Sequence, residues 1–336
     1  MSRKLLPVSI TAALMGGTAM ADVPNVAVDI APVHSLVARV MEGVGAPNLI
    51  VQAGASPHEY NLRPSEAAAL QNADLVFWMG EDLTPWMEGA VETLANGATV
   101  TPLLEADGTV LLDFREDALF EAHDHGDEDH AEEEDHDDHD HEEHAADEDH
   151  DHEDHAEHDD HHDHAHGDHD PHAWLSPKNA DTWLNVIAAQ LSAADPDNAG
   201  AYFANAAAAR AEMASLAAEV SATLEPVRGS NFIVFHDAYQ YFENAFDFPA
   251  SGAISLSDAS DPSPARISEI QGRIREEGIN CVLSEPQFNP GIVATVLDGT
   301  EANTGVIDPL GSDLEPGAKL YPQMIRNIAK TLAECL

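Results

Sequence analysis

The sequence predicts an α/β protein of two lobes, each a mostly parallel sheet flanked by helices, joined by one long rigid helix. In both halves of the chain short apolar runs alternate with helical stretches, a pattern typical of parallel sheets covered by helices. Between the halves, residues 198–224 form one Ala-rich helical stretch. At 1.5 Å per residue this helix would be about 40 Å long, more than the width of one small domain. It could join the lobes as a strut or, alternatively, pack along one lobe.

The N-terminal half, from residue 22 to 197, is expected to form the first lobe. Apolar runs predict four strands, at 25–30, 49–52, 74–79 and 98–103. Helical spacing predicts helices at 32–42, 64–71 and 84–95, the last with Thr84 as its N-cap and proline in its first turn. A further helix is expected at 176–194, capped by Ser176.

Residues 225–336 repeat the alternation and are expected to form the second lobe, with 198–224 as the linking helix. The predicted strands lie at 231–235, 250–256, 279–284 and 305–307, and the predicted helices at 238–246, 264–277, 291–297 and 320–332. In such sheets, ligands bind at the carboxyl ends of the strands.

The first 21 residues have the features of a secretory signal. A basic start, Arg3-Lys4, precedes an apolar stretch at 5–15 and the small-residue pattern Ala19-Met20-Ala21. We expect cleavage after Ala21 and export to the periplasm. The apolar stretch is too short to span a bilayer, and no cysteine lies near the cleavage site to carry a lipid anchor. The mature protein is therefore expected to have no stable membrane insertion.

Residues 121–170 form an acidic, histidine-rich segment with 16 of the 20 histidines, 26 of the 62 acidic residues and no Lys or Arg. With so few apolar side chains it cannot offset the entropy of ordering, so a disordered loop is expected. Imidazole binds borderline transition metals and carboxylates add oxygen ligands, which favours a loose site for several zinc, nickel or copper ions. The alternative is a solvated acidic spacer.

The charge of the chain restricts its partners. The formal net charge is -48, of which this segment supplies -26 and the rest -22. Such a charge argues against binding to nucleic acid or to anionic lipid, and favours the attraction of cations.

Only two cysteines occur, Cys281 and Cys335. In an exported protein the default is a disulfide, here between a predicted strand and the end of the last helix. Two buried thiols are the alternative.

Four histidines lie outside the acidic segment: His34, His58, His172 and His236. The last three sit at junctions of regular structure beside Pro, Gly or Asp, which suits a ligand held between the lobes. Three imidazoles and one oxygen make a tetrahedral zinc site. Each could instead be a hydrogen-bonded structural histidine, and His34, inside a predicted helix, is assigned to that structural class, with indirect support of a ligand as the minor possibility.

Four short motifs follow one another in the order of a known family. They are Gly-Ala-Ser-Pro-His-Glu-Tyr at 54–60 with Arg-Pro-Ser at 63–65, Asp-Pro-His-Ala-Trp-Leu-Ser at 170–176, Phe-His-Asp-Ala-Tyr at 235–239 and Ile-Asp-Pro-Leu-Gly at 307–311. With the histidine-rich loop between the first and second motifs, the mature chain resembles the ZnuA-type zinc-binding receptors of ABC transporters.

The resemblance implies that His58, His172 and His236 bind Zn²⁺ and that a membrane permease is the partner. Histidine at position 236, where manganese receptors tend to carry a carboxylate, favours zinc. Some members place a glutamate before the first histidine, but Pro57 stands there. The fourth ligand is therefore expected to be water, with Asp308 second and Glu59 third. The resemblance also implies a monomer and a linking helix that limits hinge motion.

Two other function classes remain open on sequence alone. Three histidines plus water is also the ligand set of hydrolytic zinc enzymes, although no His-Glu-x-x-His motif occurs. A metal-storage protein would use the acidic segment alone. The predicted function is instead capture of zinc by the three histidines and its delivery to the permease, with the loop as an auxiliary zinc collector.

Overall fold

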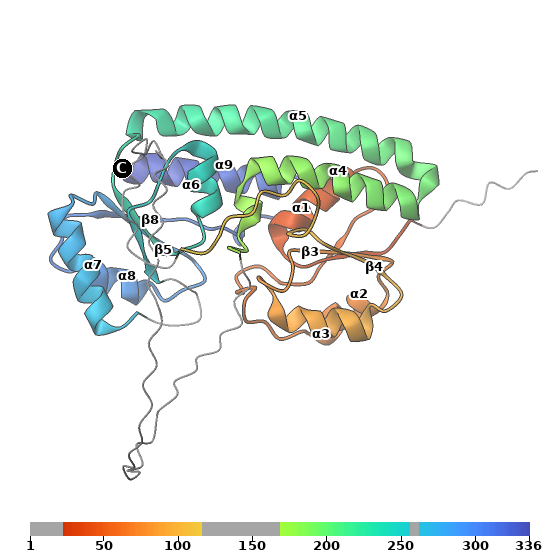
Figure 1. The fold of residues 1–336 in the computed structure, drawn as a ribbon, viewed down its shortest axis with the longest axis horizontal. Coiled ribbons are helices and arrows are strands. Elements are labelled where there is room, and N and C mark those ends of the chain that lie inside the picture. Colours follow the sequence, from red (N-terminus) through yellow and green to blue (C-terminus); the bar gives the residue numbers. More distant parts are fainter. Residues whose placement is uncertain (1–22, 116–168, 256–261) are drawn as a thin grey trace, which may run out of the picture.

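Two four-stranded parallel sheets with the same strand order form the framework (Figure 1). A computed structural model describes residues 23–115, 169–255 and 262–336 of the chain. The first sheet has the order β2-β1-β3-β4, with β1 at Val26–Val28, β2 at Asn48–Leu49, β3 at Leu75–Trp78 and β4 at Thr99–Pro102. The second has the order β6-β5-β7-β8, with β5 at Phe232–His236, β6 at Gly252–Ser255, β7 at Cys281–Ser284 and β8 at Asn303–Val306. The predicted α/β fold with two lobes is confirmed.

Each sheet has an outer face covered by two helices. These are α2 (Pro64–Gln71) and α3 (Pro85–Leu94) in the first lobe, and α7 (Pro264–Glu276) and α8 (Pro290–Leu297) in the second. Alternate strand residues point to opposite faces, so Ala27 belongs to the outer core while Val26 and Val28 belong to the inner one. Strands β1, β3, β5, β6 and β7 are buried on both faces, apart from a half-buried residue at the end of β7, which explains their apolar runs.

The inner faces of both sheets share one hydrophobic core. It is filled by α1 (Ala31–Val40), α4 (Pro177–Ala194), α5 (Ala199–Leu224), α6 (Gln240–Phe246) and α9 (Leu320–Cys335). Polar contacts reinforce this junction: the backbone N–H of Tyr321 donates to Ser35 Oγ at 2.9 Å, and the indole N–H of Trp174 donates to the Pro309 carbonyl at 2.7 Å. The two lobes therefore share one packed interior.

Helix α5 runs along one side of the molecule past both lobes (Figure 1). It has 26 residues and packs against α4, α1 and α9. Its buried side chains follow a helical stripe at Tyr202, Ala206, Ala209, Met213, Leu216, Val220 and Leu224. The prediction of a strut that joins the lobes is confirmed.

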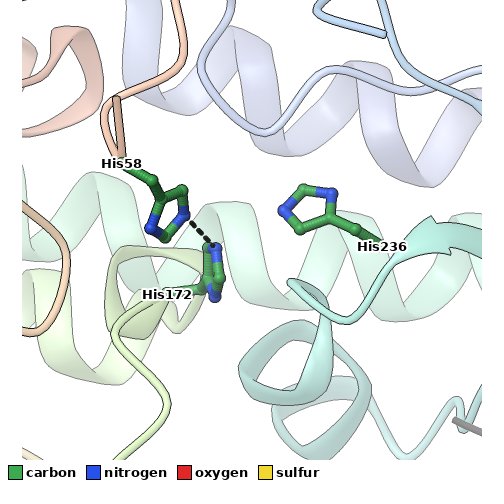
Figure 2. A group of neighbouring side chains, drawn as sticks. All are labelled: His58, His172 and His236. Atoms are coloured by element: carbon green, nitrogen blue, oxygen red, sulfur yellow. Dashed lines mark hydrogen bonds between the residues drawn. The ribbon is translucent and has the colours of Figure 1, made fainter. Parts of the chain in front are cut away.

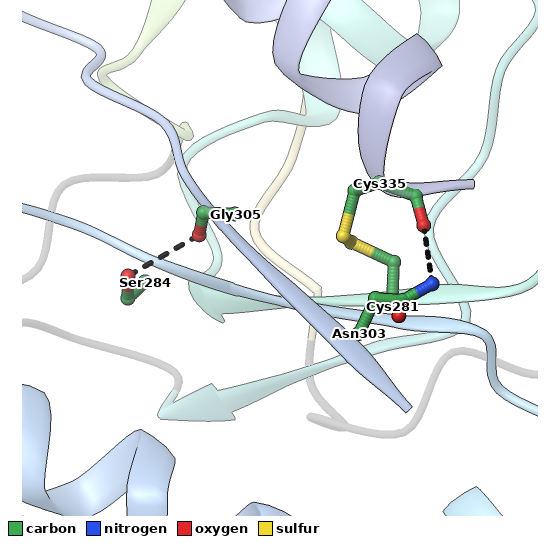
Figure 3. Close-up of a disulfide and its surroundings, with 5 residues drawn as sticks. All are labelled: Cys281, Ser284, Asn303, Gly305 and Cys335. Carbon is green, nitrogen blue, oxygen red and sulfur yellow. Dashed lines mark hydrogen bonds between the residues drawn. A yellow bond between two sulfur atoms is a disulfide. The ribbon is translucent and has the colours of Figure 1, made fainter. Parts of the chain in front are cut away.

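The predicted disulfide is present and joins the start of β7 to the end of α9 (Figure 3). The Cα atoms of Cys281 and Cys335 are 5.7 Å apart, and the residues are separated by 54 positions in the chain. Next to it the Asn303 amide donates to the Cys335 carbonyl at 3.0 Å. The last helix is thereby fixed to the second sheet.

Some local predictions differ from the structure. Thr84 does not cap α3 with its side chain; its hydroxyl donates back to the Gly80 carbonyl at 3.3 Å. Ser176 does cap α4, since its hydroxyl accepts from the Asn179 N–H at 3.3 Å. Helix α6 begins at Gln240 rather than 238, because the chain first turns at 236–238, where the Ala238 N–H donates to the His236 carbonyl.

Two predictions fall largely on residues that the structure does not describe. The signal at 1–21 lies wholly outside them, and of the segment at 121–170 only His169 and Asp170 are described. Within the described ranges, no helix combines the length and apolar character needed to cross a membrane.

Candidate metal centre

Three histidines from both lobes meet at the junction of the sheets (Figure 2). His58 lies on the loop that follows β2, His172 stands just before the short 3-10 helix Ala173–Leu175, and His236 ends β5. One ring nitrogen from each lies within 4.8 Å of the others. The three histidines that the sequence singles out are thus brought together, although 114 residues separate the first pair.

The spacing of two of these rings fits a single metal ion. The Nε2 atoms of His58 and His172 are 3.3 Å apart. In a tetrahedral zinc site with Zn–N bonds of about 2.0–2.1 Å, two ligand nitrogens lie about 3.3–3.4 Å apart. The ring centroids of His172 and His236 are 5.3 Å apart, so the third imidazole faces the same space.

Buried carboxylates orient two of the three rings. Asp170 Oδ1 is 2.7 Å from His172 Nδ1 and also accepts the backbone N–H of that histidine at 3.0 Å. Glu285 Oε1, just past β7, is 2.8 Å from His236 Nδ1. An Nδ1–H that donates to a carboxylate leaves Nε2 with its lone pair for a metal and fixes the ring orientation.

The loop that holds His58 is anchored to the outer helices of the first lobe. The indole N–H of Trp86 donates to the Pro57 carbonyl at 2.7 Å, and the Tyr60 hydroxyl donates to Glu66 at 2.8 Å. His58 itself is half-buried, whereas His172 and His236 are each about 5% exposed. This ligand is therefore the one nearest to solvent.

The cavity among the three imidazoles is small. Its volume is about 20 Å³, and its other walls include Trp174, Phe288 and Leu310. One ion or one water molecule fits such a space, while an organic substrate does not. The site therefore suits a bare metal ion.

Several buried carboxyl groups surround the site. Burial raises the pKa of Asp170 and of Asp237 to about 7, and it also raises the pKa of Glu285. Arg115 is the cation that opposes the first two shifts. A bound dication would favour the ionised carboxylates, so the site is electrostatically suited to a cation.

The two carboxylates considered as a fourth ligand do not join the cluster. The Asp308 carboxylate accepts hydrogen bonds from the backbone N–H groups of Leu310, Gly311 and Ser312, from the Ser312 hydroxyl and from the Gln287 amide. Both of its oxygens thus hold the loop after β8. Glu59 is exposed, and neither residue belongs to the group of ligand atoms within 4.8 Å.

His34 lies in α1, away from this group. Its Nε2 is 3.2 Å from the Pro47 carbonyl, and burial lowers its pKa. Its position agrees with the structural role expected from the sequence.

Asp170 and Glu285 are the site residues that the sequence did not assign. Asp170 opens the second motif, two positions before a candidate ligand, which is a usable signal. Glu285 is 49 residues from His236 and is brought beside it only by the pairing of β5 with β7.

Residues 26–335 match the ZnuA family, described as "Zinc-uptake complex component A periplasmic". The chain is 48% identical over 325 residues to the "High-affinity zinc uptake system protein ZnuA" of Brucella abortus (strain 2308), which covers 97% of this chain and 95% of that protein. The chain belongs to the ZnuA family.

Other relatives of the family agree in sequence and in fold. The protein of the same description from Paracoccus denitrificans (strain Pd 1222) is 46% identical over 331 residues, 97% of each chain. A solved structure titled "Crystal structure of ZnuA" superimposes with a TM-score of 0.70 at 20% identity, over 94% of this chain and 99% of that one. ZnuA proteins are periplasmic solute-binding components of zinc uptake, which makes this chain a transport receptor rather than an enzyme.

Proposed function

We propose that this ZnuA-family protein captures Zn²⁺ with His58, His172 and His236 and delivers it to the membrane permease of an ABC transporter. The observation that carries the proposal is the 3.3 Å separation of two Nε2 atoms in a cavity of about 20 Å³. A fourth position is left for water, because Asp308 is engaged by its own loop. Three imidazoles favour zinc over manganese, which prefers oxygen ligands.

The chemistry of capture is deprotonation and ligation, with no bond-making in a substrate. Neutral imidazoles bind the ion, and Asp170 and Glu285 hold the proton on Nδ1 of two of them. Protonation of the rings competes with the metal, so zinc affinity should fall as the pH drops below about 6.

The remaining parts of the proposal concern the chain as a whole. The first 21 residues are removed after Ala21 during export, the mature protein carries no lipid anchor, and it acts as a monomer. Residues 22–197 and 225–336 form the lobes and 198–224 the link. The segment 121–170 holds zinc weakly and raises its concentration near the interlobe site.

Equilibrium titration with zinc and a competing chelator tests the interlobe site. The full chain should show one tight zinc site and additional weak ones. Replacement of His58, His172 and His236 by alanine should abolish the tight site and keep the weak ones. The same titration with Mn²⁺ should give a much lower affinity at the tight site.

Deletion of residues 124–168 tests the role of the segment. We expect the tight site to remain and the weak zinc ions to be lost. Unchanged stoichiometry would show that the segment is a spacer. A triple alanine variant that still binds zinc tightly would instead favour a storage role for the segment and contradict the receptor function.

A further inference from the structure

The two chain ends that flank residues 116–168 lie side by side next to the metal centre. The Asp170 N–H donates to the Leu112 carbonyl at 2.8 Å, and Asp113 pairs with His169 through a β-bridge and a 3.0 Å contact between their side chains. We call residues 112–115 and 169–170 the stem. Both sides of the stem belong to the first lobe, and one side leads directly to His172.

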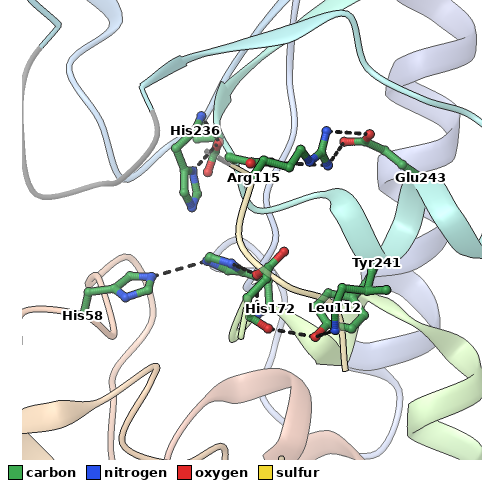
Figure 4. Close-up of polar contacts among 10 residues, drawn as sticks. His58, Leu112, Arg115, His172, His236, Tyr241 and Glu243 are labelled. Carbon is green, nitrogen blue, oxygen red and sulfur yellow. Dashed lines mark hydrogen bonds and ion pairs between the residues drawn. The ribbon is translucent and has the colours of Figure 1, made fainter. Parts of the chain in front are cut away.

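Helix α6 of the second lobe holds both sides of the stem (Figure 4). The Tyr241 hydroxyl donates to the Asp170 carbonyl at 2.8 Å and accepts the Leu112 N–H at 2.9 Å. Gln240, with its amide nitrogen toward the stem, donates to the Asp113 carbonyl and to Asp170 Oδ2, both at 3.1 Å. Tyr241 is 2% exposed, so water cannot easily replace these bonds.

A charged contact joins the same two parts. Arg115 on the stem forms ion pairs with Glu243 of α6 at 3.1 Å and with Asp237, the residue after His236, at 3.3 Å. All three side chains are largely buried, so solvent screens these pairs weakly. The stem is therefore fixed to the second lobe between the two ligands His172 and His236.

Asp170 connects this contact to the metal centre. Its Oδ1 orients the His172 ring, its Oδ2 accepts from Gln240, and its carbonyl accepts from Tyr241. The orientation of a first-lobe ligand thus depends on two second-lobe side chains. A small shift of α6 away from the stem would release Asp170 and with it the His172 ring.

We propose that Tyr241 and Gln240 are positioning residues for His172 and that they set the rate at which the metal leaves the centre. The inference rests on the proposed function, since it assumes that His172 binds the transported ion. In this proposal the contact between α6 and the stem helps to orient His172. Loss of this contact and loss of the ion should therefore occur together.

The test compares Tyr241→Phe with Tyr202→Phe in the full chain. Tyr202 is also buried and also donates one hydrogen bond, to Asp195 at 2.8 Å, but it lies on α5 at the α4 junction. We expect Tyr241→Phe to speed zinc release from the tight site into excess chelator by about tenfold, the lower end for lost outer partners of a metal ligand. Tyr202→Phe should leave the release rate unchanged at a similar loss of thermal stability.

Two further measurements separate positioning from general stability. The visible spectrum of the Co²⁺-loaded protein should change in Tyr241→Phe and not in Tyr202→Phe, because it reports the geometry of the ligands. Gln240→Met, at a half-exposed position, should also speed zinc release. If Tyr241→Phe fails to fold, the release rate of Gln240→Met tests the positioning role.

Equal release rates in Tyr241→Phe, Gln240→Met and the wild type would overturn the inference, as would equal changes in Tyr241→Phe and Tyr202→Phe. These outcomes leave the proposed function intact as long as the histidine variants lose the tight site. If the histidine variants keep it, the proposed function fails first and independently.

Discussion

The two lobes have the same strand order and the same pairing register, yet they place their chemistry differently. Val26 pairs with Leu75 in the first sheet as Phe232 pairs with Cys281 in the second. Counting along the strands, His236 and Glu285 of the second sheet correspond to two buried apolar residues of the first, Ile30 and Met79.

The difference lies in what supports each ligand. The second lobe supplies His236 from the end of a central strand, with Glu285 just past the end of the neighbouring strand β7. The first lobe supplies His58 from a loop and His172 from a turn beside the stem. One half of the centre is therefore held by a sheet and the other half by a loop and a turn, and we expect the second half to adjust more easily.

The largest expected effect comes from removal of a ligand, and it should differ between the lobes. His236→Ala should lower zinc affinity by more than about 100-fold, beyond the range for outer partners, because it removes the ligand fixed by the sheet. His58→Ala should lower zinc affinity by a smaller factor, since water can enter from the exposed side of the loop and take the place of the imidazole. Chelator competition measures both.

His34→Gln serves as the matched control, because it replaces a buried histidine outside the cluster whose Nε2 is 3.2 Å from the Pro47 carbonyl. Its zinc affinity should equal that of the wild type. A His58→Ala variant that is as impaired as His236→Ala would contradict the contrast between a rigid and an adjustable half.

The next effect concerns stability, since only the second lobe contains the disulfide. Cys281→Ala with Cys335→Ala should lower the free energy of unfolding by about 2–4 kcal/mol, because the unfolded chain regains the freedom that the cross-link removed. Hydrogen exchange should rise in β7 and α9 and much less in β1 and β3. Wild-type protein treated with reductant should behave like the variant; uniform exchange over both lobes would show that they unfold as one unit.

A smaller effect is expected from the two carboxylates that face the ligands. Glu285→Gln and Asp170→Asn keep the size of each side chain and remove its charge, so each should lower zinc affinity by about 10-fold. Asp195→Asn, at a buried carboxylate that bonds to Tyr202 and Asn198, is the control. Isothermal titration with zinc compares the three, and an affinity loss in the control equal to that in the other two would rule out a role in orientation.

The smallest effect is a change in the pH dependence of the first lobe. Asp29 is buried and accepts the N–H groups of Ile30 and Met79 at 2.7 and 2.6 Å, and burial raises its pKa to about 7. Because the folded-state pKa lies above the unfolded value, the stability that this group contributes is present at low pH and is lost as the pH rises toward 7.

Asp29→Asn removes this titration. The variant should lose some stability overall, because its amide nitrogen faces one of the two N–H donors. Its free energy of unfolding should nevertheless fall less between pH 5 and 8 than that of the wild type, as measured by denaturant titration. An identical slope in both proteins would show that Asp29 stays ionised throughout.

The sequence predicted most of the strands and helices because these elements depend on local residue patterns. Apolar runs located all eight strands in the described chain, and Ser176 located the start of α4. The lengths were less accurate: β2 ends at Leu49, although the predicted strand continued to 52. Ile50 and Val51 are buried and their N–H groups donate to the carbonyls of Val28 and Asp29, but the paired strand residues stop at Leu49. Burial and strand pairing are separate properties that an apolar run alone cannot distinguish.

Residues of the candidate metal centre could be predicted only where the adjacent residues in the sequence mark the end of a strand or helix. Each of His58, His172 and His236 lies beside residues that end regular structure. Glu285 and Tyr241 carry no such signal, because one acts through strand register and the other through a contact 71 residues away. Asp308 had the right strand-end position, but its side chain turned out to bind its own loop.

The narrowness of the cavity has a consequence for how cargo is accepted. A zinc ion that reaches the site as a complex with a small organic chelator would bring that chelator with it. A space of about 20 Å³ has no room for such companions. If the three histidines capture zinc as proposed, the chelator must leave before the ion binds. Loading should then be slower from a chelator that dissociates slowly, even when two chelators bind zinc equally well.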